Sequence, residues 1–100
     1  MRMERQMARE IACDAMNYHT DEPLAPTAAD EVRDISKTLK RVAQDDKDHN
    51  THEIDDIVNT LVNDAKQDGF TLTISPSQLM NCTTLGSLVS RVRNSSDDGK

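Results

Sequence analysis

Residues with the chemistry to bind a metal gather in the middle of the chain, where carboxylates, an amide and two imidazoles follow one another. Asp46, Asp48 and Asn50 alternate as oxygen ligands do in the first half of a calcium-binding loop. The second half departs from that pattern, because Thr51 stands where a glycine makes the sharp turn and Ile57 stands where a bidentate glutamate is required. A solvated acidic stretch explains the same residues, so we expect no calcium site.

Two histidines and two cysteines complete the set of chemically versatile residues. His49 and His52 would be one helical turn apart, and imidazole with carboxylate can bind zinc, but no Cys-x-x-Cys pair or third fixed ligand accompanies them. Cys13 and Cys82 stand in apolar helical patterns without a nearby histidine that could activate a thiol. We therefore expect reduced, buried cysteines, no metal, and a protein that is not an enzyme.

A long amphipathic helix is predicted by apolar residues that recur at spacings of three and four: Ile54, Ile57, Val58, Leu61, Val62 and Ala65. Asn50 and Glu53 have the form of a capping box, which places the helix start near Thr51. Gly69 can adopt the left-handed conformation that closes a helix. Residues 70–74 alternate apolar and polar side chains, which indicates an extended connector.

Two shorter helices follow this connector in the sequence pattern. Residues 75–78 read Ser-Pro-Ser-Gln, with a capping serine, a proline at the first helical position and a glutamine two residues after it. Thr83 or Thr84 would cap the last helix. Its buried stripe is predicted to be Leu85, Leu88, Val89 and Val92.

Upstream residues supply apolar faces that could cover these helices. A methionine-containing stripe predicts a first helix over residues 4–17, and Thr27 with Asp30 and Glu31 after it predicts the start of a second. The second helix would bury Val32, Ile35, Leu39, Val42 and Ala43.

Residues 44–52 are predicted to form a charged linker between this helix and the long one. Residues 1–93 are expected to form one helical domain, all-α and built as a bundle of four or five helices, and residues 94–100 a disordered tail.

Composition narrows the classes of partner. The 100-residue chain has a net charge of −6, which disfavours nucleic acid because phosphates would be repelled. No apolar run has the length of a membrane span, and no signal peptide is evident, so we expect a cytoplasmic protein that does not enter a membrane. The acidic balance suits docking on a basic protein surface. The oligomeric state is not indicated by any feature of the sequence.

The second half of the chain resembles the acyl and peptidyl carrier family. In that family a short third helix ends in a leucine–aromatic pair, a threonine-containing step follows, and the last helix carries paired apolar residues. Leu79-Met80, Thr83-Thr84-Leu85 and Leu88-Val89 are similar to these features in order. Gly69-Phe70 resembles the end of the family's second helix. The resemblance implies a carrier-like fold over the C-terminal half only.

The attachment site of the family is missing from the matching region. Carrier domains attach phosphopantetheine to the serine of an Asp-Ser-Leu step, and residues 50–57 contain no serine. Thr51 offers the only hydroxyl there, and Ser36, in Asp34-Ile35-Ser36, is the second candidate. The resemblance therefore leaves two readings open: a carrier-like protein without a prosthetic group, or a working carrier that uses Thr51 or Ser36.

We expect a non-catalytic, carrier-like adaptor that docks on a partner protein through an acidic helix face. By the resemblance, the docking residues are those at and before the start of the long helix: Asp45, Asp46, Asp48, Glu53, Asp55, Asp56 and Asn59. The alternatives are a working carrier modified with phosphopantetheine and a helical chaperone or assembly subunit that binds through its methionine-rich first helix.

Overall fold

The structure is a computed structural model and describes residues 2–98. In chain order its elements are α1 (Arg5–Met16), the 3₁₀ helix η1 (Ala28–Val32), α2 (Ser36–His49), α3 (Glu53–Gln67), β1 (Phe70–Leu72), α4 (Pro76–Met80), α5 (Leu85–Asn94) and β2 (Ser96–Asp98). The predicted all-α bundle is confirmed, with a short two-stranded ribbon added to it. None of the helices in this range has the length and apolarity that crossing a bilayer requires.

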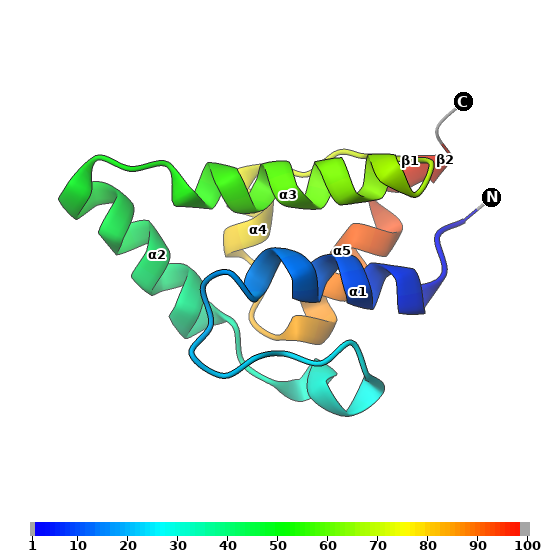
Figure 1. The fold of residues 1–100 in the computed structure, drawn as a ribbon, viewed down its shortest axis with the longest axis horizontal. Coiled ribbons are helices and arrows are strands. Elements are labelled where there is room, and N and C mark those ends of the chain that lie inside the picture. Colours follow the sequence, from blue (N-terminus) through cyan, green and yellow to red (C-terminus); the bar gives the residue numbers. More distant parts are fainter. Residues whose placement is uncertain (1, 99–100) are drawn as a thin grey trace.

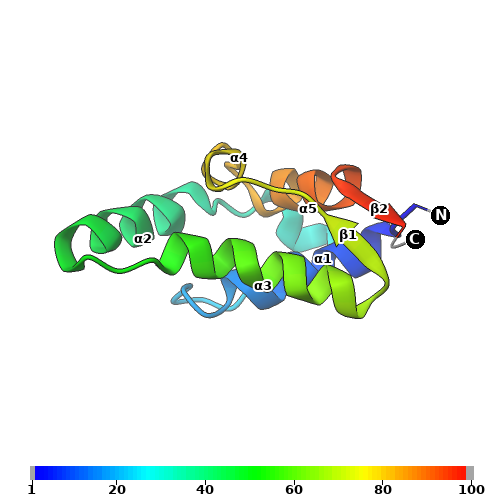
Figure 2. The ribbon, with the colours of Figure 1, turned by 90° about the horizontal axis from the view of Figure 1, so that it is seen from above.

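Helix α3 runs along the top of the molecule in Figure 1, with α1 below it and α4 and α5 behind, and α1 packs against both α3 and α5 (Figures 1 and 2). Helix α2 descends from the start of α3, so that the two form a corner at one end of the molecule (Figure 1). The core between the helices is aliphatic and includes the fully buried Met16, Leu39, Leu61, Leu79 and Leu88. One tyrosine and one phenylalanine are the only aromatic residues of the chain, so leucine, isoleucine, valine and methionine fill this core.

The C-terminal half follows the sequence pattern closely. Ser75 caps α4 and Thr84 caps α5, each through a capping box in which the side chain accepts from the third helical N–H. The predicted stripe of α5 is buried in full, and Gly69 closes α3 with a φ of 88°. These signals act over three or four residues, which is why the sequence displays them.

The second helix begins later than predicted. Thr27 caps the 3₁₀ turn η1 rather than an α-helix, and Val32, predicted to be buried, is 80% exposed. The chain is extended after η1 because it pairs with the start of α5: the Ile35 N–H donates to the Thr83 carbonyl, and the Leu85 N–H donates to the Arg33 carbonyl. Helix α2 therefore starts only at Ser36.

The predicted charged linker over residues 44–52 is helical for most of its length. Helix α2 continues to His49, and Asn50 ends it in the left-handed conformation, with φ 53° and ψ 45°. The predicted capping box of Asn50 and Glu53 is therefore wrong, because Asn50 belongs to the end of α2. Helix α3 begins at Glu53, and His52 provides no side-chain cap.

The predicted disordered tail is wrong for residues 94–98. Asn94 ends α5, and β2 pairs antiparallel with β1, with Leu72 opposite Ser96 and Phe70 opposite Asp98. The Ser96 hydroxyl is buried and donates to the Val92 carbonyl at 2.6 Å. Pairing through the backbone leaves no apolar pattern in the polar tail, so its composition did not reveal the strand. Residues 99 and 100 of the predicted tail lie outside the described residues.

The two ends of the described chain lie beside each other, next to the ribbon (Figures 1 and 2). The Arg93 guanidinium donates to the Met3 carbonyl at 2.9 Å, and Met3 is fully buried. The start of α3 and the ribbon lie at opposite ends of the molecule (Figure 1).

Candidate protein-docking surface

The end of α2 and the start of α3 together carry most of the protein's net negative charge, and we call this region the acidic corner. It consists of Asp45, Asp46, Asp48, Glu53, Asp55 and Asp56, with Asn59 one turn further along α3. Six carboxylates and one lysine, Lys47, lie between positions 45 and 56, so this corner holds five of the chain's six net negative charges. A field of one sign at one end of the molecule steers an oppositely charged partner to that end.

Four of the predicted docking residues are available to a partner. Asp48, Asp55, Asp56 and Asn59 are exposed, whereas Asp45 and Glu53 are half-buried. His52 lies near Asp55, with 3.9 Å between Nδ1 and the carboxylate oxygen.

Asp46 differs from the others because its carboxylate is used inside the fold. One oxygen accepts from the Thr51 hydroxyl at 2.7 Å and the Glu53 N–H at 2.8 Å, and the other accepts from the Ile54 N–H at 3.0 Å. These donors, the Thr51 hydroxyl first, lower the pKa of Asp46 below its usual range, against the opposing effect of burial. Asp46 thus caps α3 from the preceding helix and is a structural residue.

The other two carboxylates near the end of α2, Asp45 and Asp48, do not cap α3. Asp45 and Asp48 lie at the C-terminal end of α2, where the helix dipole disfavours negative charge, while Asp55 and Asp56 lie at the favoured N-terminal end of α3. Asp48 accepts one hydrogen bond, from Gln44 at 2.9 Å. Folding therefore does not explain why acidic residues stand at the end of α2.

Both candidate attachment hydroxyls are hydrogen-bonded to a carboxylate. The Thr51 hydroxyl donates to Asp46, and the Ser36 hydroxyl donates to Asp34 at 2.6 Å. A phosphodiester on either oxygen would displace that hydrogen bond and place its negative charge beside the carboxylate. Both carboxylates also accept backbone N–H groups that they would lose if they moved away.

No metal centre is formed by the described residues: between positions 2 and 98, no three His, Cys, Asp or Glu side chains are arranged to hold an ion. Asp46, the first residue of the calcium-like stretch, faces N–H donors instead. The two free cysteines are both buried, as predicted, and burial raises the pKa of the Cys13 thiol to about 11.

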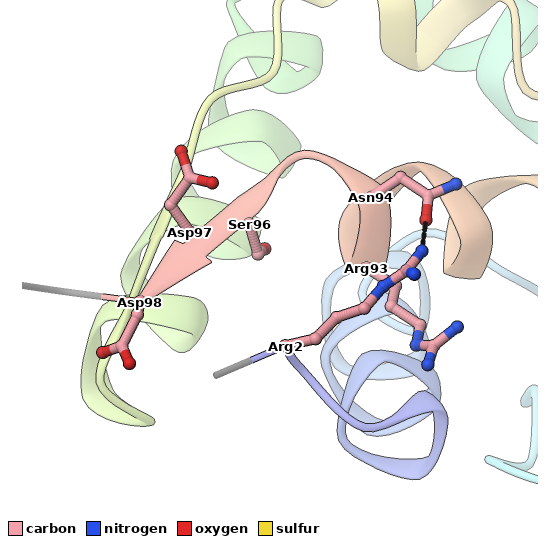
Figure 3. Close-up of a pocket in the computed structure, with 6 residues that line it drawn as sticks. All are labelled: Arg2, Arg93, Asn94, Ser96, Asp97 and Asp98. Carbon is pink, nitrogen blue, oxygen red and sulfur yellow. Dashed lines mark hydrogen bonds between the residues drawn. The ribbon is translucent and has the colours of Figure 1, made fainter.

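A pocket of about 590 Å³ lies between the chain ends, and its lining is of mixed charge (Figure 3). Arg2 and Arg93 lie together, and Arg2 donates to the Asn94 side chain, while Asp97 and Asp98 of β2 point away from the two guanidinium groups (Figure 3). The polar groups do not converge on one point, so we assign no ligand to this pocket.

Two charged clusters appear in the structure that the sequence analysis missed. Glu31 of η1 accepts from Arg5 and from Arg9 of α1, the latter at 2.6 Å, and these bonds lower its pKa to about 2. Asp64 of α3 meets Asp14 of α1, and burial, the hydrogen bond with Asp14 and the charges of Asp14 and Asp68 raise its pKa to about 7. Both clusters join elements that are distant in sequence, so no local spacing signals them.

Tyr18 is the third feature that the sequence analysis passed over. It follows α1, and its side chain is 74% exposed. A lone tyrosine in a polar loop forms no pattern in the sequence that would indicate a binding site, because the residues beside it come from other elements.

Comparisons of this chain with protein-family models, curated proteins and solved structures return no match.

Proposed function

We propose that this protein is a non-catalytic, carrier-like adaptor that docks on a basic protein surface through the acidic corner. The observation that carries the proposal is the concentration of five of six net negative charges at one exposed end of the molecule, including Asp45 and Asp48 at a helix end that disfavours them. Charges that cost folding free energy are most simply explained by a partner that neutralises them.

The packing of the first helix supports an adaptor over a chaperone that binds through methionines. Met3 and Met16 are fully buried, and Met7 packs against the core. The methionine stripe is therefore used to hold α1 against the rest of the bundle. A chaperone-like surface would need these side chains at the exterior.

The hydrogen bonds of Thr51 and Ser36 support an adaptor over a working carrier, because each hydroxyl is bonded to a carboxylate. We expect no change in intact mass after incubation with a phosphopantetheinyl transferase and coenzyme A. A covalent adduct on either residue would overturn the adaptor proposal in favour of the carrier.

Docking through exposed ion pairs has a recognisable energetic signature. Each pair contributes roughly 0–1 kcal/mol and is screened by salt, so several must form together. Neutralising a few of them should slow association more than it speeds dissociation, because the corner acts by steering.

The test compares two variants that lose the same charge. The corner variant carries Asp45→Asn, Asp48→Asn and Asp55→Asn, and the control variant carries Glu4→Gln, Glu10→Gln and Asp21→Asn, three exposed carboxylates outside the corner. Each protein is immobilised and exposed to the cytosol of its source, and retained proteins are identified by mass spectrometry. The affinity and association rate of each retained protein are then measured from 50 to 300 mM salt.

We expect a basic protein that binds the wild type and the control variant equally, binds the corner variant about tenfold more weakly, as three lost pairs of about 0.5 kcal/mol each imply, and weakens with salt. Equal binding to the corner and control variants would refute docking through this corner.

A further inference from the structure

The side chain of Tyr18 is exposed although the turn that holds it is fixed by hydrogen bonds. The His19 N–H donates to the Met16 carbonyl at 2.9 Å, and Arg41 of α2 donates to the His19 carbonyl. The Asn17 side chain donates to the Leu24 carbonyl at 3.0 Å and accepts the Leu24 N–H at 2.8 Å. The ring is thus presented to solvent by an ordered backbone, so a partner would spend little entropy in ordering the turn that carries it.

Beside this ring lies a hollow of about 240 Å³ that reaches α3. It is lined by Ala15, Tyr18, His19, Asp56 and Thr60. Small-molecule sites commonly enclose roughly 300–1,000 Å³. The smaller size of this hollow suits a single side chain from another protein.

The chemistry of the lining favours a cation. Asp56, which lines the hollow, is an exposed carboxylate of the acidic corner. The face of an aromatic ring attracts a cation, and a carboxylate beside the ring pairs with it. The hollow therefore extends the acidic corner from α3 to the turn after α1.

We infer that the hollow between Tyr18 and Asp56 receives one arginine side chain of the partner, with its guanidinium against the Tyr18 ring and the Asp56 carboxylate. This inference rests on the proposed docking function and adds the identity of a contact. Arginine fits better than lysine because its planar guanidinium can stack on a ring and bind a carboxylate through two N–H groups at once.

The chain offers a specific probe, because Tyr18 is its only tyrosine and it has no tryptophan. Tyrosine fluorescence of the 100-residue chain therefore reports on this hollow alone. The ligand is an acetylated and amidated Gly-Arg-Gly peptide, titrated in low-salt buffer, with the lysine and the citrulline peptides as controls. Citrulline keeps the shape of arginine and removes its charge.

We expect a saturable change in Tyr18 fluorescence with the arginine peptide, a weaker one with the lysine peptide and none with citrulline. Asp56→Asn should weaken arginine binding about threefold or more, whereas Asp48→Asn, away from the hollow, should leave it within about twofold. NMR chemical shifts of the His19 and Thr60 backbone amides provide a second readout. They also report on binding to Tyr18→Leu, which lacks the fluorescent tyrosine. An equal response to arginine and citrulline, or an unchanged affinity in Asp56→Asn, would overturn the inference.

If the docking test identifies a partner, measuring its affinity for further variants distinguishes the arginine contact from docking through the acidic corner. Partner binding that depends on Asp45, Asp48 and Asp55 but is unchanged in Tyr18→Leu overturns the arginine contact and leaves docking intact. Arginine-peptide binding at the hollow, together with partner binding that is indifferent to the corner variant, supports the contact and overturns docking through the corner.

Discussion

At the scale of single residues, the Glu31 carboxylate stabilises the fold by joining segments that are distant in sequence. Glu31 joins η1 to α1 through Arg5 and Arg9, and its side chain is only 15% exposed. The same region is tightly packed, because a Cβ added at Gly86 of α5 would lie 3.0 Å from the Glu31 carbonyl oxygen. Glu31 therefore anchors a segment that has no buried apolar residue of its own in η1.

Replacing this carboxylate tests its contribution. We expect Glu31→Gln to lower the free energy of unfolding by about 1–3 kcal/mol at pH 7, because two guanidinium groups lose a charged acceptor. The pKa of Glu31 is lowered from 4.5 to about 2 in the folded protein, so its contribution is complete above about pH 4.5 and declines as the pH falls toward 2. Urea unfolding followed by circular dichroism at pH 7, 4.5 and 3 measures the difference.

The control is Asp21→Asn, which removes an exposed carboxylate from the loop after α1. It should change the unfolding free energy by less than about 0.5 kcal/mol. If both variants unfold alike at pH 7, the Arg5–Glu31–Arg9 cluster adds no net stability.

At the scale of elements, the contact between α1 and α3 contains an unfavourable pair. Asp14 and Asp64 face each other in a hollow that Glu10 and Asp68 also line. Burial, then the hydrogen bond with Asp14 and the negative charges of Asp14 and Asp68, disfavour the ionised form of Asp64 and raise its pKa. The α1–α3 interface is thus more stable when Asp64 is protonated.

This pair predicts a pH dependence opposite in sign to that of Glu31. Because the pKa of Asp64 is raised from 3.8 to about 7, the stability of the folded state falls as the pH rises from about 4 to about 7, and the loss is complete above that range. Asp64→Asn should therefore stabilise the protein by about 1 kcal/mol at pH 8, after allowance for solvent screening, and by almost nothing at pH 4. Thermal unfolding at both pH values, with Asp21→Asn as the control, tests this; a variant less stable than the wild type at pH 8 would contradict it.

Elements whose signals are local could be predicted from the sequence, and those that depend on distant partners could not. The starts of α4 and α5 could be predicted from Ser75 and Thr84, because a capping box lies within a few consecutive residues. Asp46 caps α3 from seven and eight residues away, and Asp34 is drawn out of a helix by its bridge to Thr84. The acidic corner was visible as a run of charge, but Tyr18 gains its significance only from the approach of α3.

At the scale of the whole molecule, the ribbon closes the end opposite the acidic corner. Strand β2 pairs antiparallel with β1, whose Phe70 and Leu72 are buried. The tail is therefore part of the domain, although its composition is that of a solvated segment.

Shortening the chain tests this role. A variant that ends at Ser95 should lose the pairing with β1 and the buried Ser96 hydrogen bond, and should be less stable by about 1–3 kcal/mol. The control ends at Asp98, so that both strands remain. The melting temperature should fall only in the shorter variant; equal values for the two would show that β2 contributes nothing to stability.

The adjacency of Met3 and Arg93 has a practical consequence for measuring complexes. Dyes placed near Met3 or Arg93 would share one location, and the molecule extends 41 Å along its longest axis. Energy transfer from such a dye to a labelled partner would therefore be weaker when the partner binds at the acidic corner than when it binds at the ribbon. A single fluorophore could thus distinguish the two ends of the protein while leaving the acidic corner unlabelled.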